Sequence, residues 1–385
     1  MLQAKVKKED FLKGLSQTSN IAGKFHSMPI LSNVLLETQD GKLVLSATDL
    51  EITYQAYYEC ETGGDGRITV PAKTLIDTVK GMVDEYITLT EKENQTLEIS
   101  NESFRGSIYG LSADDFPRLA PFQDAEVDMA EFSGDALVDS IGKTINSVST
   151  NTSNFNLAGI YWIKESKDGE GETVRLVSSD SNRLNVATMR PAGIEKFNPE
   201  QGVLVSRKGL NELKGMAEGA ESVMIGINSS KQLACRAEGS VLIMRLLEGK
   251  FPDYNGLMPP DPTVTLEMNR REVTDTLKRM TPMNSPKYRV VFFRFSQDSV
   301  LVTIENPEVG HAEEKLPIEY SGEEMVVGFD PRHILEALIS IRSERFRISY
   351  VDVKTPVVLT AHDDPGWMCI VSTISPKDTS AGRAG

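Results

Sequence analysis

The sequence predicts an α+β protein made of three tandem copies of one domain, and three observations lead to this prediction. A chain of 385 residues is too long for a single hydrophobic core. A Phe-Pro phrase occurs at Phe116 and again at Phe251, and the spacing of 135 residues is about the length of one domain. Segments with helical periodicity alternate along the chain with segments typical of strands.

One helix of each copy is marked by a repeated phrase. VPAKTLIDTVKGM begins at Val70, VSRKGLNELKGMA begins at Val205 and FDPRHILEALISI begins at Phe329. Each phrase opens with an apolar residue and a Pro, Ser or Asp-Pro start signal, and apolar residues follow at helical spacing. These phrases predict helices over residues 71–82, 206–217 and 330–341.

A second helix precedes each of these phrases. The predicted ranges are residues 7–23, 133–148 and 269–281, and Ser133 and Asn269 are suitable N-caps. The stretches between the helices alternate apolar and polar residues around turn signals, as in VLLETQDGKLVLSATDLEITYQAYYE, which begins at Val34. Each copy therefore has the order helix, strands, helix, strands.

The repeat places the predicted domain boundaries near the Phe-Pro phrases. We expect domains over residues 1–124, 125–254 and 255–374, with the two phrases as linkers between copies. Residues 375–385 are small and polar, and we expect them to form a disordered tail.

The net charge of −15 counts against nucleic acid as a partner, but the charge is unevenly distributed. The six predicted helices carry 14 basic and 10 acidic residues, which leaves −19 for the rest of the chain. The fourth position of the repeated phrases is basic in all three copies, as Lys73, Lys208 and Arg332. A solvated helix face explains any one of these cations, whereas their recurrence favours a common anionic surface.

Other features exclude several classes of site. The three cysteines, Cys60, Cys235 and Cys369, have no metal-site spacing and are expected to be buried free thiols. The histidines His311 and His362, each followed closely by acidic residues, fit an edge strand and a turn better than a metal site. We therefore expect no catalytic residue, metal or cofactor. There is no apolar run long enough for a membrane span and no signal peptide, so we expect a cytoplasmic protein without membrane contacts.

Six phrases in order resemble one known family. MPILSNVLLE, SATDLEI, DFPRL, SSDSNRL, EGKFPDYNGLMP and TIENPEVGHAEEKL are similar to phrases of the bacterial DNA polymerase sliding clamps, the beta subunits of the replicative polymerase. The resemblance covers residues 1–374. It implies a DNA clamp fold and a head-to-tail homodimer that closes a six-domain ring around duplex DNA, with helices inside and sheets outside.

The resemblance also implies contacts with DNA that are indifferent to base sequence. The expected contact residues share a place on the helices or loops of the inner face. They are Lys24, Lys73, Asn151, Phe155, Asn156, Arg207, Lys208 and Arg332.

A groove between the second and third domains is expected to bind short peptides of partner proteins. The family implies the replicative polymerase, the clamp loader, other polymerases and mismatch-repair proteins as partners. The groove residues are Leu157, Ser179, Asn182, Arg183, Leu184, Pro252, Leu257, Pro356, Met368, Cys369 and Ile370. Where the family usually ends in a Met-Pro-Met-Arg-like phrase, this chain has Ile370-Val371-Ser372-Thr373, so we expect an altered peptide preference. Arg183 beside apolar residues needs an acceptor, which a peptide carbonyl could supply.

The dimer interface is expected to join the first domain of one chain to the third domain of the other. By resemblance, Ile108 faces Pro282 and Met283, and Arg105 faces Glu308, Glu313 or Glu314.

Two interpretations from other classes remain open. One is a repeat-built adaptor that binds only proteins and does not encircle DNA. The other is a DNA-processing enzyme, which a plasmid-nicking assay would detect.

Overall fold

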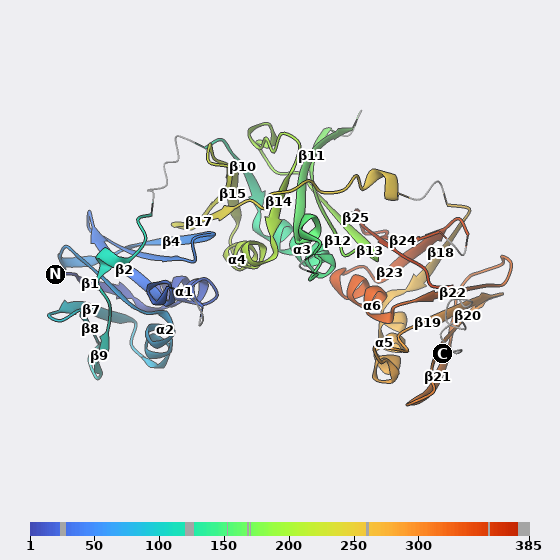
Figure 1. Cartoon of the computed structure of the whole chain (residues 1–385), viewed down its shortest axis with the longest axis horizontal. Coiled ribbons are helices and arrows are strands. Elements are labelled where there is room, and N and C mark those ends of the chain that lie inside the picture. The colour runs from blue at the N-terminus through green and yellow to red at the C-terminus, as the bar shows by residue number, and fades with distance from the viewer. Residues whose placement is uncertain are drawn as a thin grey trace. The chain divides into compact units, whose positions relative to one another are not determined.

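The computed structural model describes residues 1–23, 28–119, 127–151, 153–167, 169, 171–258, 262–352 and 355–375. The chain folds into two compact units. Its helices and strands are labelled in Figure 1. The first contains Met1–Val138, Pro191–Glu200 and Lys208–Leu246, and the second contains Asp139–Arg190, Gln201–Arg207 and Leu247–Gly385. The division passes through the middle repeat, so the three domain boundaries stay predictions.

The six predicted helices are confirmed. Their bounds are α1 Lys8–Thr18, α2 Ala72–Gly81, α3 Gly134–Thr144, α4 Arg207–Ala217, α5 Arg270–Met280 and α6 Pro331–Ser340. The Asn269 side chain caps α5 by accepting a hydrogen bond from the Glu272 N–H at 3.1 Å, and Ser133 accepts a longer one of 3.5 Å from the Ala136 N–H. The helix predicted over residues 133–148 ends earlier, because a 3-10 turn at Ile145–Ser147 replaces its last turn.

Each repeat contains two motifs in which a strand, a helix and three strands follow one another. The strands are β1 Gln3–Lys7, β2 Asn33–Gln39, β3 Lys42–Thr48, β4 Ile52–Glu59, β5 Glu61–Gly64, β6 Gly66–Pro71, β7 Tyr86–Lys92, β8 Thr96–Ser100 and β9 Arg105–Tyr109 in the first repeat. The second repeat has β10 Met129–Ser133, β11 Gly159–Lys167, β12 Gly171–Ser179, β13 Arg183–Met189, β14 Val203–Ser206, β15 Ser222–Ile227, β16 Gln232–Ala237 and β17 Ser240–Arg245. The third has β18 Val264–Asn269, β19 Val291–Ser296, β20 Ser299–Asn306, β21 Gly310–Pro317, β22 Met325–Phe329, β23 Arg345–Tyr350, β24 Val357–Ala361 and β25 Asp364–Val371.

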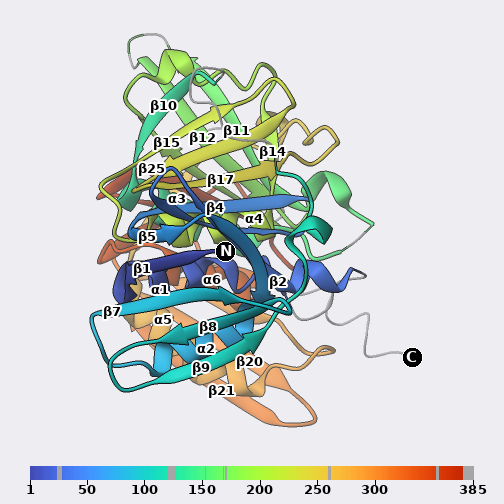
Figure 2. The same ribbon diagram turned by 90° about the vertical axis from the view of Figure 1, so that its left-hand side faces the viewer.

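The strand before each helix joins the sheet formed by the three strands of the other motif in its repeat, and pairs with the first of those three. The first repeat thus gives the sheet β5-β1-β7-β8-β9, with β7, β8 and β9 side by side in Figure 2. The third repeat gives the sheet β21-β20-β19-β22. Because each strand crosses to the other motif, the two motifs of a repeat fold around each other rather than as separate modules.

Two larger sheets run from one repeat into the next. One has the order β10-β15-β16-β17-β4-β3-β2-β6, and the other has the order β14-β11-β12-β13-β25-β24-β23-β18. The strand pairs β4·β17 and β13·β25 therefore join neighbouring repeats through backbone hydrogen bonds. We call these two strand pairs the joints.

The Phe-Pro phrases have a second role besides linking repeats. Phe116 is buried in a cluster with Ile30, Leu31 and Leu35, and Phe251 is buried in a cluster that contains Leu157. Leu31 and Leu157 occupy the same place in their repeats, two residues before β2 and β11 respectively. Each phenylalanine thus anchors the departing chain to the repeat that it leaves.

In the described part of the chain, no helix is long and apolar enough to cross a membrane. Over the same residues, no three His, Cys, Asp or Glu side chains gather as metal ligands. Cys235 and Cys369 are buried free thiols as expected, whereas Cys60 is only half-buried.

Candidate functional site: an apolar groove at the second joint

A cavity of about 300 Å³ lies at the β13·β25 joint, within the second compact unit. The turn before β13 forms one wall, and the end of β25 and Pro356 form another. The chain segment that contains Phe251 and Pro252 closes the third side. The cavity therefore draws on the second repeat, the third repeat and the linker between them.

The floor of this groove is apolar because buried side chains from both repeats meet there. Leu184 and Ile370 are opposite one another in the β13·β25 pair, and both belong to one buried cluster with Leu157 and Phe251. The Phe251 ring stacks on the Tyr161 ring, with centroids 5.1 Å apart and an interplanar angle of 4°. Leu257 remains 52% exposed at the edge of the cavity, so it is available to an apolar ligand.

The predicted groove residues are largely brought together. Nine of the eleven line the cavity: Leu157, Ser179, Asn182, Arg183, Leu184, Pro252, Leu257, Pro356 and Ile370. Cys369 does not line it, because alternation along β25 turns this side chain into the core of the third repeat, where it is completely buried. Met368 does not line the cavity either, and packs against the buried cluster at its margin.

Three further residues line the groove and were not predicted: Ser181, Phe251 and Ser372. The sequence contained a signal for Phe251, since its phrase is repeated, but that repetition indicated a linker. Ser372 was noted only as a departure from the family.

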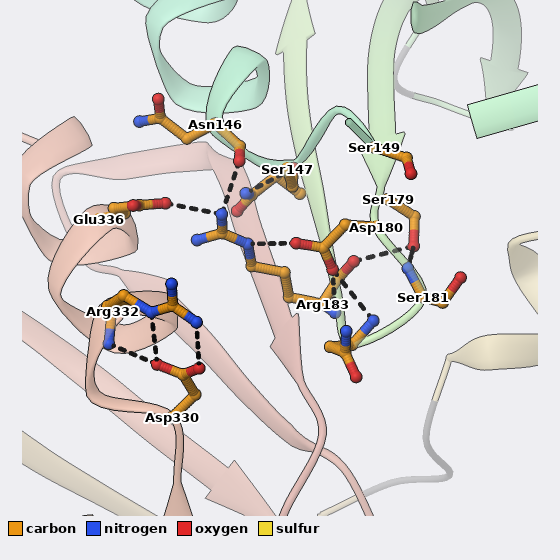
Figure 3. A network of polar contacts seen from close by, with 12 residues as sticks. Asn146, Ser147, Ser149, Ser179, Asp180, Ser181, Arg183, Asp330, Arg332 and Glu336 are labelled. Atoms are coloured by element: carbon orange, nitrogen blue, oxygen red, sulfur yellow. Dashed lines mark hydrogen bonds and ion pairs between the residues drawn. The ribbon is translucent and has the colours of Figure 1, made fainter. Parts of the chain in front are cut away.

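Arg183 finds its acceptors inside the chain rather than on a peptide, which corrects the expectation from the sequence (Figure 3). Its Nε donates to Asp180 at 3.0 Å, and its Nη2 donates to the Asn146 carbonyl at 2.5 Å and to Glu336 on α6 at 2.6 Å. The side chain is only 6% exposed. Arg183 therefore ties the turn before β13 to a helix of the third repeat, and fixes the wall of the groove.

A polar cleft of about 540 Å³ adjoins the groove and shares part of its wall, namely Ser181, Asn182, Arg183 and Ser372. Asn151 and Arg332, both predicted DNA contacts, line this cleft together with His333. Burial lowers the pKa of His333, and the nearby Arg183 cation lowers it further. The cleft thus presents an imidazole with a lowered pKa and hydrogen-bonding groups beside the apolar groove.

Two of the three repeated cations are paired with acids, which the sequence did not predict. Lys208 forms an ion pair with Asp49, and Arg332 pairs with Asp330 at 2.8 Å. Both cations keep about half of their side-chain surface exposed, at 42% and 53%. Lys73 is exposed. Lys24 lies outside the described residues.

The remaining predicted DNA contacts are dispersed over several elements. Arg207 begins α4 and is half-buried, and Asn151 lies in the loop after α3. Phe155 is 63% exposed in a 3-10 turn at Phe155–Leu157, which also contains the half-buried Asn156.

The predicted interface residues lie on β9, on β21 and in the segment before β19. Arg105 begins β9 and is exposed, whereas Ile108 is only 7% exposed and so is already covered within the chain. Pro282 and Met283 lie in the 3-10 turn Thr281–Met283 after α5. Glu313 and Glu314 lie on β21, and Glu308 lies in the turn before it. The Arg279 guanidinium donates to Glu314 and thereby lowers the pKa of that carboxyl group.

Comparison with known proteins gives a consistent match along the chain. Family models for the N-terminal, central and C-terminal domains of the DNA polymerase III beta subunit match residues 2–120, 131–253 and 255–372. The beta sliding clamp of Escherichia coli K12 is 30% identical over 349 residues, which is 90% of this chain and 92% of that protein. The beta sliding clamp of Vibrio cholerae is 27% identical over 376 residues, or 96% and 98% of the two chains.

Solved structures are also similar. The DNA polymerase sliding clamp of Caulobacter crescentus superimposes with a TM-score of 0.87 at 25% identity, covering 97% of this chain and 100% of that one. The clamp of Thermotoga maritima has a TM-score of 0.87 at 24% identity, with the same coverage, and supports the fold alone.

Proposed function

The chain belongs to the bacterial DNA polymerase III beta subunit family, and on this premise we propose that it is a DNA sliding clamp. As a processivity factor it encircles duplex DNA as a head-to-tail homodimer and tethers the replicative polymerase. Bacterial chromosomal DNA lies in the cytoplasm, so the site of action is placed there. Its function requires binding and topological linkage, and we assign it no catalytic step or cofactor.

The joints are the observation that carries this proposal. In each joint, the last strand of the first motif of one repeat pairs with the last strand of the second motif of the next repeat. The first and second repeats are joined in this way by β4·β17, and the second and third repeats by β13·β25. Among the residues that the structure describes, two such strands have no counterpart, because β9 pairs only with β8 and β21 pairs only with β20. A second copy of the chain supplies the missing partner for each, and two copies then satisfy every last strand.

The groove is assigned to partner peptides. It offers an apolar floor of Leu184 and Ile370 with an exposed Leu257 at its edge, which suits a short extended segment with apolar side chains. Asn182 and Ser372 add polar groups at the same cavity. We assign the replicative polymerase, the clamp loader, other polymerases and mismatch-repair proteins to this one site, so that they compete for it.

The repeated cations are assigned to DNA phosphates. Lys73, Lys208 and Arg332 are each the second residue of their helices, α2, α4 and α6, and all three present exposed charge. Phosphate contacts of this kind carry no sequence information and suit a protein that moves along the duplex. The acids paired with Lys208 and Arg332 weaken their hold on any one phosphate, which favours mobility.

The test of this function is retention on DNA of different topology. The protein, loaded by a clamp loader onto nicked circular plasmid, is expected to co-elute with that plasmid in gel filtration and to be released when the plasmid is linearised. Equal retention on circular and linear DNA would indicate ordinary binding. No retention on either would favour the protein-binding adaptor.

A further inference from the structure

A cavity of about 350 Å³ at the first joint, β4·β17, has no part in the function proposed above. It lies within the first compact unit and shares no lining residue with the groove or with the polar cleft. Helix α1 and strand β4 of the first repeat form one side, and the end of α4 and the β16–β17 turn of the second repeat form the other. A ligand in this cavity would therefore contact two repeats at once.

The second joint, β13·β25, has the same register as the first and can be compared with it position by position. At the first joint the Arg245 N–H donates to the Glu51 carbonyl at 2.8 Å. At the second joint the Ser372 N–H donates to the Asn182 carbonyl at 2.9 Å. Positions counted from these two hydrogen bonds are equivalent in the two joints.

Five residues before the two N–H donors, the joints differ greatly in side-chain size. Ser240 occupies this position in the first joint and Trp367 in the second, and each is opposite an alanine of the other strand. The Trp367 side chain is 1% exposed and packs in the core of the third repeat. Ser240 lines the cavity instead. The first joint thus lacks an indole ring where the second joint has one.

A second exchange of a large for a small residue lies on the neighbouring helix. The ninth residue of α4 is Gly215, whereas the ninth residue of α6 is Ile339, and Gly215 lines the cavity. Tyr54 fills part of the space, since its hydroxyl group is hydrogen-bonded to that of Ser240. The cavity is the space that remains, and it is bounded by residues too small to fill it.

The lining of the cavity combines aromatic and apolar surface with one available amide. Tyr54 and Tyr58 contribute aromatic side chains, and Met216 contributes a polarisable thioether. Gln17 of α1 is half-buried at the cavity, and among the described residues its side-chain amide has no hydrogen-bond partner. A flat ring with one hydrogen-bonding group matches this lining.

The charged groups around the cavity balance one another. Lys13 pairs with Glu238 at 2.6 Å and so joins α1 to the β16–β17 turn. Glu59 pairs with Lys42 at 2.8 Å. The other charged lining residues, which have opposite signs, are Lys7 and Asp10. A neutral ligand therefore suits the cavity better than an ion.

We propose that this cavity binds a neutral, planar aromatic molecule of about the size of indole, with one hydrogen-bonding group that meets the Gln17 amide. The ligand takes the place that Trp367 has at the second joint, and its contacts with both repeats stabilise the first joint. This inference goes beyond the proposed clamp function, because it depends on neither DNA, ring closure nor the peptide groove.

Indole itself is the probe, and its dissociation constant is measured by ligand-observed NMR on the full-length protein. The peptide groove is kept occupied by an excess of a polymerase C-terminal peptide, so that indole bound there does not contribute. The expected dissociation constant is on the order of 1 mM, as for a very small ligand. The melting temperature is expected to rise with indole concentration, because the ligand binds the folded chain.

Two variants copy the second joint and fill the cavity. Gly215→Ile places a side chain against the Gln17 amide, which lies 2.8 Å from the position of an added Cβ, and Ser240→Trp restores the missing ring. Each is expected to weaken indole binding at least about tenfold. Gly142→Ile is the matched control, because Gly142 is the ninth residue of α3 and an added Cβ meets nothing within 4 Å. Circular dichroism checks that each variant retains the fold.

The outcomes separate this site from adventitious binding. Parent-like indole affinity in both Gly215→Ile and Ser240→Trp would overturn the proposal, as would an equal loss of affinity in Gly142→Ile. Absence of saturable binding to the parent up to about 10 mM indole would also overturn it. Gln17→Leu is expected to weaken binding about threefold to tenfold by removing one hydrogen bond, and an unchanged affinity would exclude the amide from the site.

Discussion

At the scale of single residues, the two joints differ in how they neutralise a glutamate at the same position of a helix. Glu336 of α6 is paired with Arg183 at the second joint, whereas its counterpart Glu212 of α4 has Ile52 at the position equivalent to Arg183. Glu212 is 3% exposed, and its Oε1 has no hydrogen-bond partner among the described residues. Burial raises the pKa of Glu212 to about 7, and the nearby Asp49 raises it while Asn20 and Lys208 lower it.

This difference predicts a pH dependence of stability. The pKa of Glu212 is higher in the folded chain than in the unfolded one, so its contribution is most favourable at acidic pH and is lost as the pH rises through about 7. Glu212→Gln, which keeps the shape without the charge, is expected to stabilise the protein by roughly 1–3 kcal/mol at pH 8 and to have little effect near pH 5. Urea unfolding at both pH values measures this, with Glu336→Gln as the control. A variant no more stable than the parent at pH 8 would contradict it.

Arg183 leads to a second prediction at this scale. Its removal leaves Asp180 and Glu336, whose side chains are 21% and 42% exposed, without the buried cation that they share. Arg183→Ala is expected to lower the free energy of unfolding by about 2–3 kcal/mol, measured by urea denaturation. Arg332→Ala removes a cation that is half exposed and is expected to cost less than about 1 kcal/mol. Equal losses in the two variants would show that the Arg183 network does not stabilise the joint.

At the scale of elements, the sequence predicted what depends on local pattern. The six helices and the strands between them follow from periodicity, because a helix or hairpin buries its own apolar face. The pairing of β13 with β25 could not be predicted from pattern alone, since strands so distant in sequence carry no local mark of each other. For the same reason Glu336 as the acceptor of Arg183 was missed. The groove residues came from resemblance. Of the two exceptions, Cys369 is turned inward by strand alternation and Met368 packs beside the cavity.

The groove leads to a prediction about peptide binding. Leu257→Asp places a charge at the exposed edge of the groove, where an apolar peptide side chain would lose its contact. The affinity for a peptide from the C-terminus of a polymerase is expected to fall at least about tenfold, measured by fluorescence anisotropy. Ile339→Asp is the control, because Ile339 on α6 is exposed to a similar degree, 54%, and does not line the groove. A parent-like affinity in Leu257→Asp would place the peptide site elsewhere.

The helices give a prediction about DNA. Lys73→Gln with Lys208→Gln is expected to slow loading onto primed DNA and to reduce the salt dependence of loading, because fewer phosphate contacts release fewer counterions. The slope of log rate against log salt is expected to flatten by about one for each contact removed. Lys196→Gln, an exposed lysine in the 3-10 turn Ile194–Lys196, serves as the control. An unchanged slope in the double variant would remove these two lysines from the DNA surface.

At the scale of the whole molecule, an acidic chain that works on DNA becomes understandable if retention does not depend on affinity. A net charge of −15 repels the duplex as a whole, and the cations at the helix starts are partly neutralised by neighbouring acids. Such a surface would bind DNA weakly and exchange phosphates readily. A closed ring holds the duplex by linkage, so weak contacts allow sliding without loss of the clamp.

If linkage rather than affinity retains the protein, the effect of salt on its lifetime on DNA can be predicted. The lifetime of the loaded protein on nicked circular DNA is expected to change little between about 0.1 and 1 M NaCl, although screening at 1 M removes nearly all phosphate attraction. Loss from circles is then limited by opening of the β9·β21 contact, whereas loss from linear DNA occurs by sliding off the ends at any salt concentration.

Gel filtration of labelled protein on circular, linear and end-blocked linear DNA measures the three lifetimes, and blocked ends are expected to restore retention. Because salt also weakens charged contacts between two copies, the dimer dissociation constant must be measured at the same salt concentrations. A lifetime on circles that falls with salt as steeply as loading does, while the dimer remains intact, would mean that phosphate contacts rather than linkage hold the protein on DNA.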